Sequence, residues 1–186
     1  DAVNFIRVSG HVNKIDIHHA HSDGLDLDYS DLSFGDINIY NAGNDCLDLS
    51  AGNYKVDSAN LNNCYDKAIS VGENSNVIIY NSIFHKNNIG LATKDGSNAY
   101  ILYSNLENNK TQLSAYKKNW QYGKGGSAQV FNSYFVANTN HFNSGNKSKI
   151  LIDDSSVVGK VNLEGKNLIF QDDVDFFDSK NISSNQ

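Results

Sequence analysis

A 22-residue repeat is the feature that most restricts how this chain can fold. Short alternating apolar runs recur at that spacing, namely Leu25/Leu27, Leu47/Leu49, Ile69/Val71, Leu91/Thr93 and Leu113/Ala115. A second series contains Ile15/Ile17, Ile37/Ile39, Val56, Ile78/Ile79 and Ile101/Leu102. Alternation over a few residues is typical of strands with one buried face. Each repeat therefore contains several short strands.

A fixed period with several strands per repeat predicts a solenoid. We expect an all-β, right-handed parallel β-helix in which 186 residues make about eight coils of about 22 residues. A leucine-rich repeat would need a Leu-dense consensus with a helical segment, and a β-sandwich would not keep a fixed period. Residues 1–186 are expected to form one β-helix domain of a longer chain, with a loop inserted at about 116–126.

The composition excludes several classes of protein. The 28 Asn and 14 Gly residues make the chain rich in turn formers, and two Cys are too few for a disulfide-stapled miniprotein. No apolar run approaches the roughly 18–20 residues of a membrane helix, so we expect no membrane insertion. The formal charge of −6 argues against a nucleic-acid partner.

Four short motifs fall on successive repeats, namely Ser22-Asp23-Gly24-Leu25-Asp26, Asn44-Asp45-Cys46-Leu47, Asp66-Lys67-Ala68-Ile69-Ser70-Val71-Gly72 and Gly90-Leu91-Ala92-Thr93-Lys94. The repeat resembles the pectin-lyase-like superfamily, and the motifs resemble those of its polygalacturonases. The resemblance implies a polysaccharide substrate, with Asp23, Asp45 and Lys94 at matching positions. Lys67 and Ala92 stand where that family has His and Arg, which argues against pectin hydrolysis.

A second resemblance covers roughly residues 20–126. The segments that carry it are Asp66-Lys67-Ala68-Ile69-Ser70-Val71-Gly72-Glu73-Asn74-Ser75, Lys94-Asp95-Gly96-Ser97, Tyr116-Lys117-Lys118 and Tyr122-Gly123. They resemble β-helix segments of bacterial surface proteins that contain CotH-like or lamin-tail domains. This resemblance implies an extracellular or cell-envelope location and a place within a larger chain.

Outward positions of the repeat concentrate charge on the first four coils. Asp23, Asp45, Lys67 and Lys94 are the candidate catalytic residues, because paired carboxylates suit glycoside hydrolysis and a lysine base suits a lyase. Asp26, Asp28 and Asp48 are candidate calcium ligands, since Ca²⁺ takes several carboxylate oxygens. The alternative is that these outward carboxylates only keep the surface soluble.

The insertion contains the only Trp of the chain. Its candidate substrate-binding residues are Tyr116, Lys118, Trp120 and Tyr122, because aromatic rings stack on sugars and lysines attract acidic glycans. The alternative is that the aromatic rings pack down on the solenoid and anchor the loop.

The histidines and cysteines give weaker signals. His11, His18, His19 and His21 cluster near the first motif, and they are interpreted as turn residues, a transition-metal site or a catalytic acid or base. Cys46 and Cys64 fall at different points of adjacent repeats, so no disulfide is expected, and Cys64 is expected to be buried.

Two functions follow from these patterns. The first is an extracellular β-helix that binds a polysaccharide and acts on an acidic one as a lyase or hydrolase, with calcium as its expected cofactor. The second is a non-catalytic structural or adhesive segment of a surface protein. Because strand-like sequence begins at Phe5-Ile6 without a capping helix, further domains or a capping partner are expected at the solenoid ends.

Overall fold

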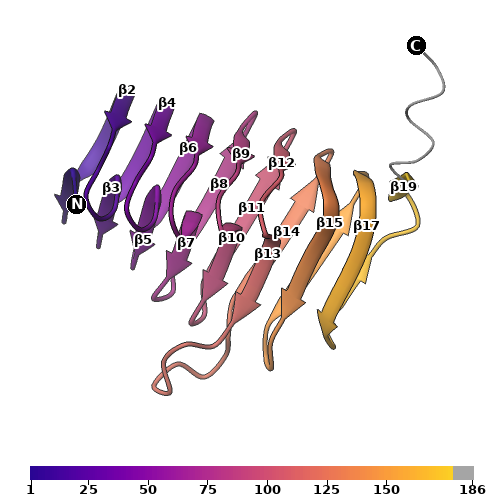
Figure 1. Ribbon diagram of the computed structural model, residues 1–186. Coiled ribbons are helices and arrows are strands. Elements are labelled where there is room, and N and C mark those ends of the chain that lie inside the picture. Colours follow the sequence, from indigo (N-terminus) through magenta and orange to yellow (C-terminus); the bar gives the residue numbers. More distant parts are fainter. Residues whose placement is uncertain (178–186) are drawn as a thin grey trace, which may run out of the picture.

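The structure is a computed structural model that describes residues 1–177, and it is a parallel β-solenoid. Its 19 described strands all pair in parallel with strands of neighbouring coils. The coils, of about 22 residues each, stack along one axis to give about eight turns (Figure 1). This confirms the predicted all-β solenoid. Residues 178–186 of the predicted domain lie outside the described residues.

Three sheets run the length of the solenoid. The first sheet contains β1 (Val3–Ile6), β3 (Leu25–Asp28), β5 (Leu47–Ser50), β7 (Lys67–Gly72), β10 (Ile89–Lys94) and β13 (Thr111–Tyr116). The second contains β8 (Asn76–Tyr80), β11 (Asn98–Leu102), β14 (Ser127–Phe131), β16 (Lys149–Asp153) and β18 (Leu168–Phe170). The third contains β9 (Ile83–His85), β12 (Asn105–Glu107) and β19 (Asp175–Phe177).

Five longer strands pass from one sheet into the next. They are β2 (Ser9–His18), β4 (Asp31–Tyr40), β6 (Asn53–Asn62), β15 (Tyr134–Ser144) and β17 (Ser156–Gly165). β6 shows the change directly, because its first half pairs with β8 and its second half with β9. Among residues 1–177 there is no helix long and apolar enough to cross a membrane.

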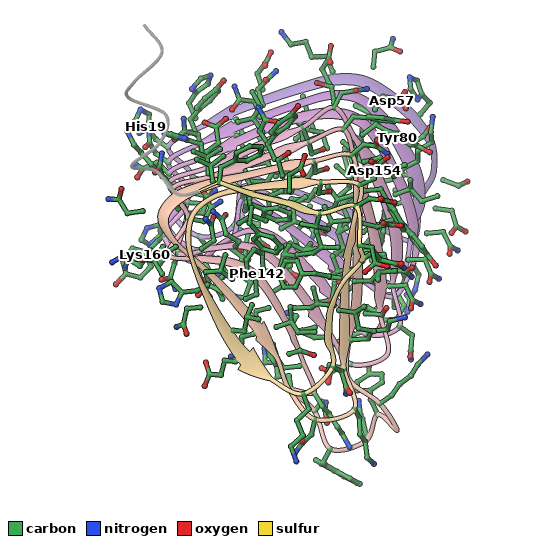
Figure 2. All side chains as sticks on the ribbon, turned by 90° about the vertical axis from the view of Figure 1, so that its right-hand side faces the viewer. His19, Asp57, Tyr80, Phe142, Asp154 and Lys160 are labelled. Atoms are coloured by element: carbon green, nitrogen blue, oxygen red, sulfur yellow. A yellow bond between two sulfur atoms is a disulfide. The ribbon has the colours of Figure 1, made fainter. Side chains whose placement is uncertain are left out.

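The pairing register between coils equals the sequence repeat in the first sheet. Leu25 pairs with Leu47, which in turn pairs with Ile69. Inward residues therefore stack on inward residues, and the side chain of Phe142 lies inside the coil in the view of Figure 2. A one-residue slip would turn every inward side chain outward, so the apolar pattern itself fixes the register.

A ladder of serines closes the corner between the second and third sheets. The backbone N–H groups of Ser82, Ser104 and Ser133 each donate to the side-chain oxygen of the serine one coil further on, at 3.1 Å. Each serine hydroxyl also donates to the carbonyl two residues earlier, as Ser104 does to Leu102 at 2.9 Å. All four serines, including Ser155, are buried. The ladder thus satisfies buried polar groups that the turn would otherwise leave without partners.

Asparagines recur at corners where the backbone is left-handed. Asn41 and Asn63 have φ values of 60° and 57° at one corner, and Asn81 and Asn132 have 46° and 49° at another. Asn tolerates this conformation better than most residues because its short amide bonds locally to the backbone. Six of the 28 Asn residues have this backbone conformation, so left-handed turns account for part of the abundance of Asn.

The two cysteines form a disulfide, and the prediction that they would not is wrong. Their Cα atoms lie 5.5 Å apart, within the usual range for a bridge. Cys46 is 0% exposed and Cys64 is 2% exposed, which confirms the predicted burial of Cys64. Both cysteines lie at one corner, one before the first sheet and one after the third, where inward side chains converge across the turn. Counting positions along the coil missed this convergence.

We predict that Ser104→Ala lowers the free energy of unfolding by about 1–3 kcal/mol, because it leaves the buried N–H of Ser82 without an acceptor. Urea unfolding measures the change. Ser9→Ala, at an exposed position of β2, is the control and should change stability little. Equal stability of the two variants would contradict a structural role for the ladder.

We predict that the double variant Cys46→Ala/Cys64→Ala loses about 3 kcal/mol of stability, the value expected for closing a loop of this size. Urea unfolding with and without a reducing agent measures it. The wild type should lose a comparable amount in the reducing agent, whereas the double variant should not respond. A wild type that is insensitive to reduction would mean that the bridge does not form.

Candidate functional site

The outward face of the first sheet brings the predicted charged residues together in columns. Asp26 on β3 pairs in register with Asp48 on β5, and Asp48 pairs with Ser70 on β7. Lys94, at the end of β10, pairs with Tyr116 at the end of β13. Residues that are 22 apart in sequence are thus neighbours on one surface.

Asp23 and Asp45 form a second ladder at the turn that leads into this sheet. The Asp23 carboxylate accepts hydrogen bonds at 2.8 Å from the Asn44 amide and from the Asp45 backbone N–H. The Asp45 carboxylate in turn accepts from the Lys67 backbone N–H at 3.0 Å. Each carboxylate therefore holds the next coil in place, and Asp45 is only 3% exposed.

Lys67 is neutralised by two carboxylates. Its ammonium group lies 3.2 Å from Asp45 and also forms an ion pair with Asp66. Burial raises the pKa of Asp45 to about 6, and this effect outweighs the opposing charge of Lys67. Burial alone would raise the pKa of Asp66 and lower that of Lys67, but their hydrogen bond reverses both shifts. Lys67 is consequently held protonated and is poorly suited to accept a proton.

Lys94 has a different environment one coil further on. Its ammonium group donates to the Ser70 hydroxyl at 2.6 Å, and among the described residues no carboxylate forms an ion pair with it. The side chain is 8% exposed. Burial lowers the pKa of Lys94, with Lys67 and Lys118 acting in the same direction and Asp48 opposing them. A lysine with these properties is the best candidate base on this face.

Gly72 on the preceding coil leaves the space that the Lys94 side chain occupies. A Cβ atom added at Gly72 would lie 3.3 Å from Cε of Lys94 and 3.7 Å from its Nζ. The lysine stem therefore lies across Gly72 on the preceding coil and reaches Ser70. A larger residue at this position would push the stem away from the sheet.

Lys94 lines a groove of about 420 Å³ between the first sheet and the inserted loop. The other lining residues are Asp48, Ser50, Gly72, Glu73, Asp95, Lys118, Asn119 and Trp120. One carboxylate oxygen of Asp48 is buried there without a hydrogen-bond partner.

The inserted loop, residues 117–126, forms one wall of this groove and extends away from the coils (Figure 1). The carboxylate of Asp95 accepts the backbone N–H groups of Lys118 and Asn119 at 2.8 and 2.9 Å, which fixes the start of the loop. Trp120 is 88% exposed, so its ring does not pack on the solenoid. Tyr122 is partly buried and does not line the groove.

The predicted calcium ligands lie on the same face but do not form a metal cluster. Burial raises the pKa of Asp26 to about 6, and the charge of Asp28 acts in the same direction. The Asn4 amide donates to both carboxylates, at 2.6 Å to Asp26 and 3.3 Å to Asp28. Within residues 1–177, no group of three or more His, Cys, Asp or Glu side chains is arranged to hold a metal ion. Calcium stays a prediction.

The histidines stay near the first coil and do not join the groove. His11, His18, His19 and His21 are exposed. The His11 ring lies 2.9 Å from the Ser33 hydroxyl, and the His18 ring stacks on Tyr40 with centroids 5.2 Å apart. His11 and His18 lie on β2, so the interpretation as turn residues is wrong for these two and fits only His19 and His21.

Sequence reasoning did not single out four residues that shape the site. Ser70 binds Lys94, Asp66 neutralises Lys67, Gly72 gives Lys94 its path, and Asp95 holds the loop. Both aspartates directly adjoin a candidate lysine in the sequence, which was a usable signal. Ser70 and Gly72 gave none, because their roles depend on the neighbouring coil.

Comparison with known proteins gave no match among family models, curated sequences or solved structures. The resemblances to pectin-lyase-like and bacterial surface proteins therefore stay predictions.

We predict that the free energy of unfolding falls as the pH rises from about 4 to about 6, partly because of Asp45. The pKa of Asp45 is about 6 in the folded protein and 3.8 in the unfolded chain. Between these values the folded state binds more protons at Asp45 than the unfolded state does, so the free energy of unfolding falls as the pH rises. Asp45→Asn should make the fall less steep in urea unfolding at several pH values. The exposed Asp36 provides the control Asp36→Asn, which should leave the slope unchanged. Parallel curves for wild type and Asp45→Asn would refute the assignment.

Proposed function

We propose that the groove beside Lys94 binds a polysaccharide and cleaves an acidic one by β-elimination, with Lys94 as the general base. The observation that carries this proposal is the contrast between Lys94 and Lys67. Lys94 is buried, has a lowered pKa and lacks an ion-pair partner among the described residues, whereas Lys67 is paired with Asp45 and Asp66. A base must be deprotonated near the working pH, and only Lys94 has an environment that favours this.

The reaction balances with Lys94 as the base and solvent water as the proton donor. The neutral amine of Lys94 takes the proton from the carbon next to the uronate carboxylate. The electron pair forms a carbon–carbon double bond as the glycosidic C–O bond breaks. The leaving oxygen takes up a proton from solvent water. Tyr116 pairs in register with Lys94 but does not line the groove, so we do not assign it as the proton donor.

Two further features support binding of an acidic sugar chain. Lys118 at the groove places a positive charge where a uronate carboxylate needs one as negative charge develops on it. The exposed ring of Trp120 offers a flat apolar surface on which a sugar ring can stack. The carboxylate of Asp48, which lines the groove, can accept a sugar hydroxyl or, if calcium takes part, contribute one ligand.

Hydrolysis by Asp23 and Asp45 has less support. A hydrolase needs two carboxyl groups on opposite sides of the scissile bond. Both carboxylates instead accept backbone N–H groups of the next coil, and Asp45 is almost completely buried. We therefore assign them to positioning the coils and Lys67.

An extracellular or cell-envelope location fits the disulfide. Bridges form and persist in oxidising compartments and are rare in the cytosol. The buried bridge between Cys46 and Cys64 joins the coils that hold Asp45 and Lys67. The covalent link thus supports both the proposed location and the geometry of the groove.

A non-catalytic structural or adhesive segment is the second candidate function. The structural contacts of the other candidate catalytic residues favour it, because Lys67 is paired with Asp45 and Asp66, and Asp23 and Asp45 accept backbone N–H groups of the next coil. In that case the groove would bind a glycan without cleaving it.

We predict that the protein releases unsaturated uronate products from one or more acidic polysaccharides, and that Lys94→Ala lowers the rate by about 100-fold or more. The conjugated product absorbs ultraviolet light, so its appearance is followed directly. The panel includes polygalacturonate, alginate and neutral dextran, each with Ca²⁺ and with EDTA. Lys55→Ala is the control, because Lys55 is exposed and pairs with Asp57 away from the groove.

The outcomes separate the two functions. Binding of a polysaccharide without any unsaturated product would support the non-catalytic function. Product release that persists in Lys94→Ala would place the base elsewhere. Product release that stops in EDTA would add calcium to the site.

A further inference from the structure

Positive charge is concentrated in the middle coils of an acidic protein. Residues 1–93 contain 12 acidic and five basic residues, whereas residues 94–152 contain seven lysines and only two acidic residues. The middle coils therefore carry a formal charge of +5 within a chain of net charge −6. Salt screens charges beyond about a Debye length, roughly 8–10 Å at physiological salt. A ligand bound at the middle coils is therefore affected by their positive charge more than by the net negative charge of the whole protein.

Three of these lysines surround a second cavity, the basic pocket, which has a volume of about 400 Å³. The basic pocket is lined by Lys124, Lys147 and Lys149, by Asn98, Ser127, Ser148 and Asn167, and by Gly125, Gly126 and Ile169. Five ion pairs are formed among residues 1–177, and none of them includes any of the three lysines. Their charges are thus available to a ligand.

The backbone of successive coils fixes the spacing of the lysines. The N–H of Gly125 donates to the carbonyl of Lys147, and the N–H of Lys149 donates to the carbonyl of Gly126, both at 3.0 Å. A Cβ atom at Gly126 would overlap the backbone of Thr93, so the end of the loop is pressed directly against β10. The backbone positions from which the three lysine side chains project are therefore fixed by these contacts.

The shape of the basic pocket comes from the end of an amide ladder. Along the second sheet, Asn76 donates to Asn53 at 3.1 Å and Asn98 donates to Asn76 at 2.9 Å. In the next coil the small Ser127 pairs in register with Asn98, and Lys149 follows it. Ser127 has a short hydroxyl where the preceding coils have an Asn amide, so the ladder ends there and leaves space. Lys149, on the following coil, places a positive charge beside this space.

We propose that the basic pocket binds an anionic group, a sulfate ester or a carboxylate, of the same polysaccharide that enters the groove. This proposal rests on the proposed function and extends it by naming an acidic chain as the ligand and a second contact for it. The inserted loop links the two places, because Lys118 and Trp120 line the groove and Lys124 and Gly125 line the basic pocket. A chain that crosses the loop would meet lysines on both sides of it.

The test compares two triple variants with the same change of charge. Lys124→Gln/Lys147→Gln/Lys149→Gln removes the basic pocket. Lys86→Gln/Lys110→Gln/Lys160→Gln removes three exposed lysines that line neither the groove nor the basic pocket. Isothermal titration calorimetry measures binding of dextran sulfate, polygalacturonate and neutral dextran, with single-stranded DNA as a different polyanion. Unfolding curves confirm that each variant is folded.

We expect the first triple variant to bind dextran sulfate or polygalacturonate about tenfold more weakly than wild type, because it loses three moderate charge contacts. The control variant should bind these polymers as tightly as wild type does. Loss with dextran sulfate alone assigns a sulfate ester, and loss with polygalacturonate assigns a carboxylate. Equal affinities for the two triple variants would overturn the proposal, and so would equally tight binding of DNA that depends on the same lysines.

The proposed cleavage reaction can fail independently of this proposal. Lys94→Ala, measured in the same binding experiment, should keep the contact with the basic pocket. Loss of binding in the triple variant without any cleavage by wild type would leave the basic pocket in place and refute only the lyase activity. If wild type cleaves the polysaccharide and the triple variant binds it as tightly as wild type does, the lyase activity would stand and the basic pocket would be refuted as a binding site.

Discussion

Backbone hydrogen bonds between successive coils are the interaction on which the rest of this structure depends. They join residues that are 22 or 23 apart in most coils, 29 apart where the loop is inserted and 18 to 22 apart in the last coils, and so convert a sequence period into stacked columns. Each coil by itself could not bury its apolar face, and stacking supplies the missing contacts. The serine ladder and the left-handed corner residues serve this stacking, because they let the chain turn without leaving buried polar groups unpaired.

The same stacking gives two lysines on adjacent coils different chemistry. Lys67 follows Asp66 and stacks beside Asp45, so its charge is compensated twice. Lys94 stacks on a coil that offers only a hydroxyl and a glycine at the corresponding places. Burial disfavours the protonated form of Lys94, and the charge of Asp48 opposes this effect only in part. A solenoid can thus separate a structural lysine from a candidate base by one repeat.

The inserted loop organises the charged surface. It interrupts the repeat after Tyr116 without disturbing the sheets, because β14 resumes pairing with β11 in register. Its two ends border the groove on one side and the basic pocket on the other. Loops on solenoids tolerate insertion because the strands around them keep their own hydrogen bonds. The exposed Trp120 and the lysines therefore occupy a wall that the scaffold holds in place.

The period and the alternation of apolar residues determined the fold, since they dictate which side chains face inward and which residues stack. They also placed Asp48 and Lys94 on one face, and the groove confirms that arrangement. The contacts that a side chain makes with neighbouring coils depend on its direction, and only the tertiary structure determined them. The disulfide formed because inward side chains converge at a corner, and the charge state of Lys94 depends on what the preceding coil places under it. Such contacts are set by direction and burial in three dimensions, which spacing along the chain does not contain.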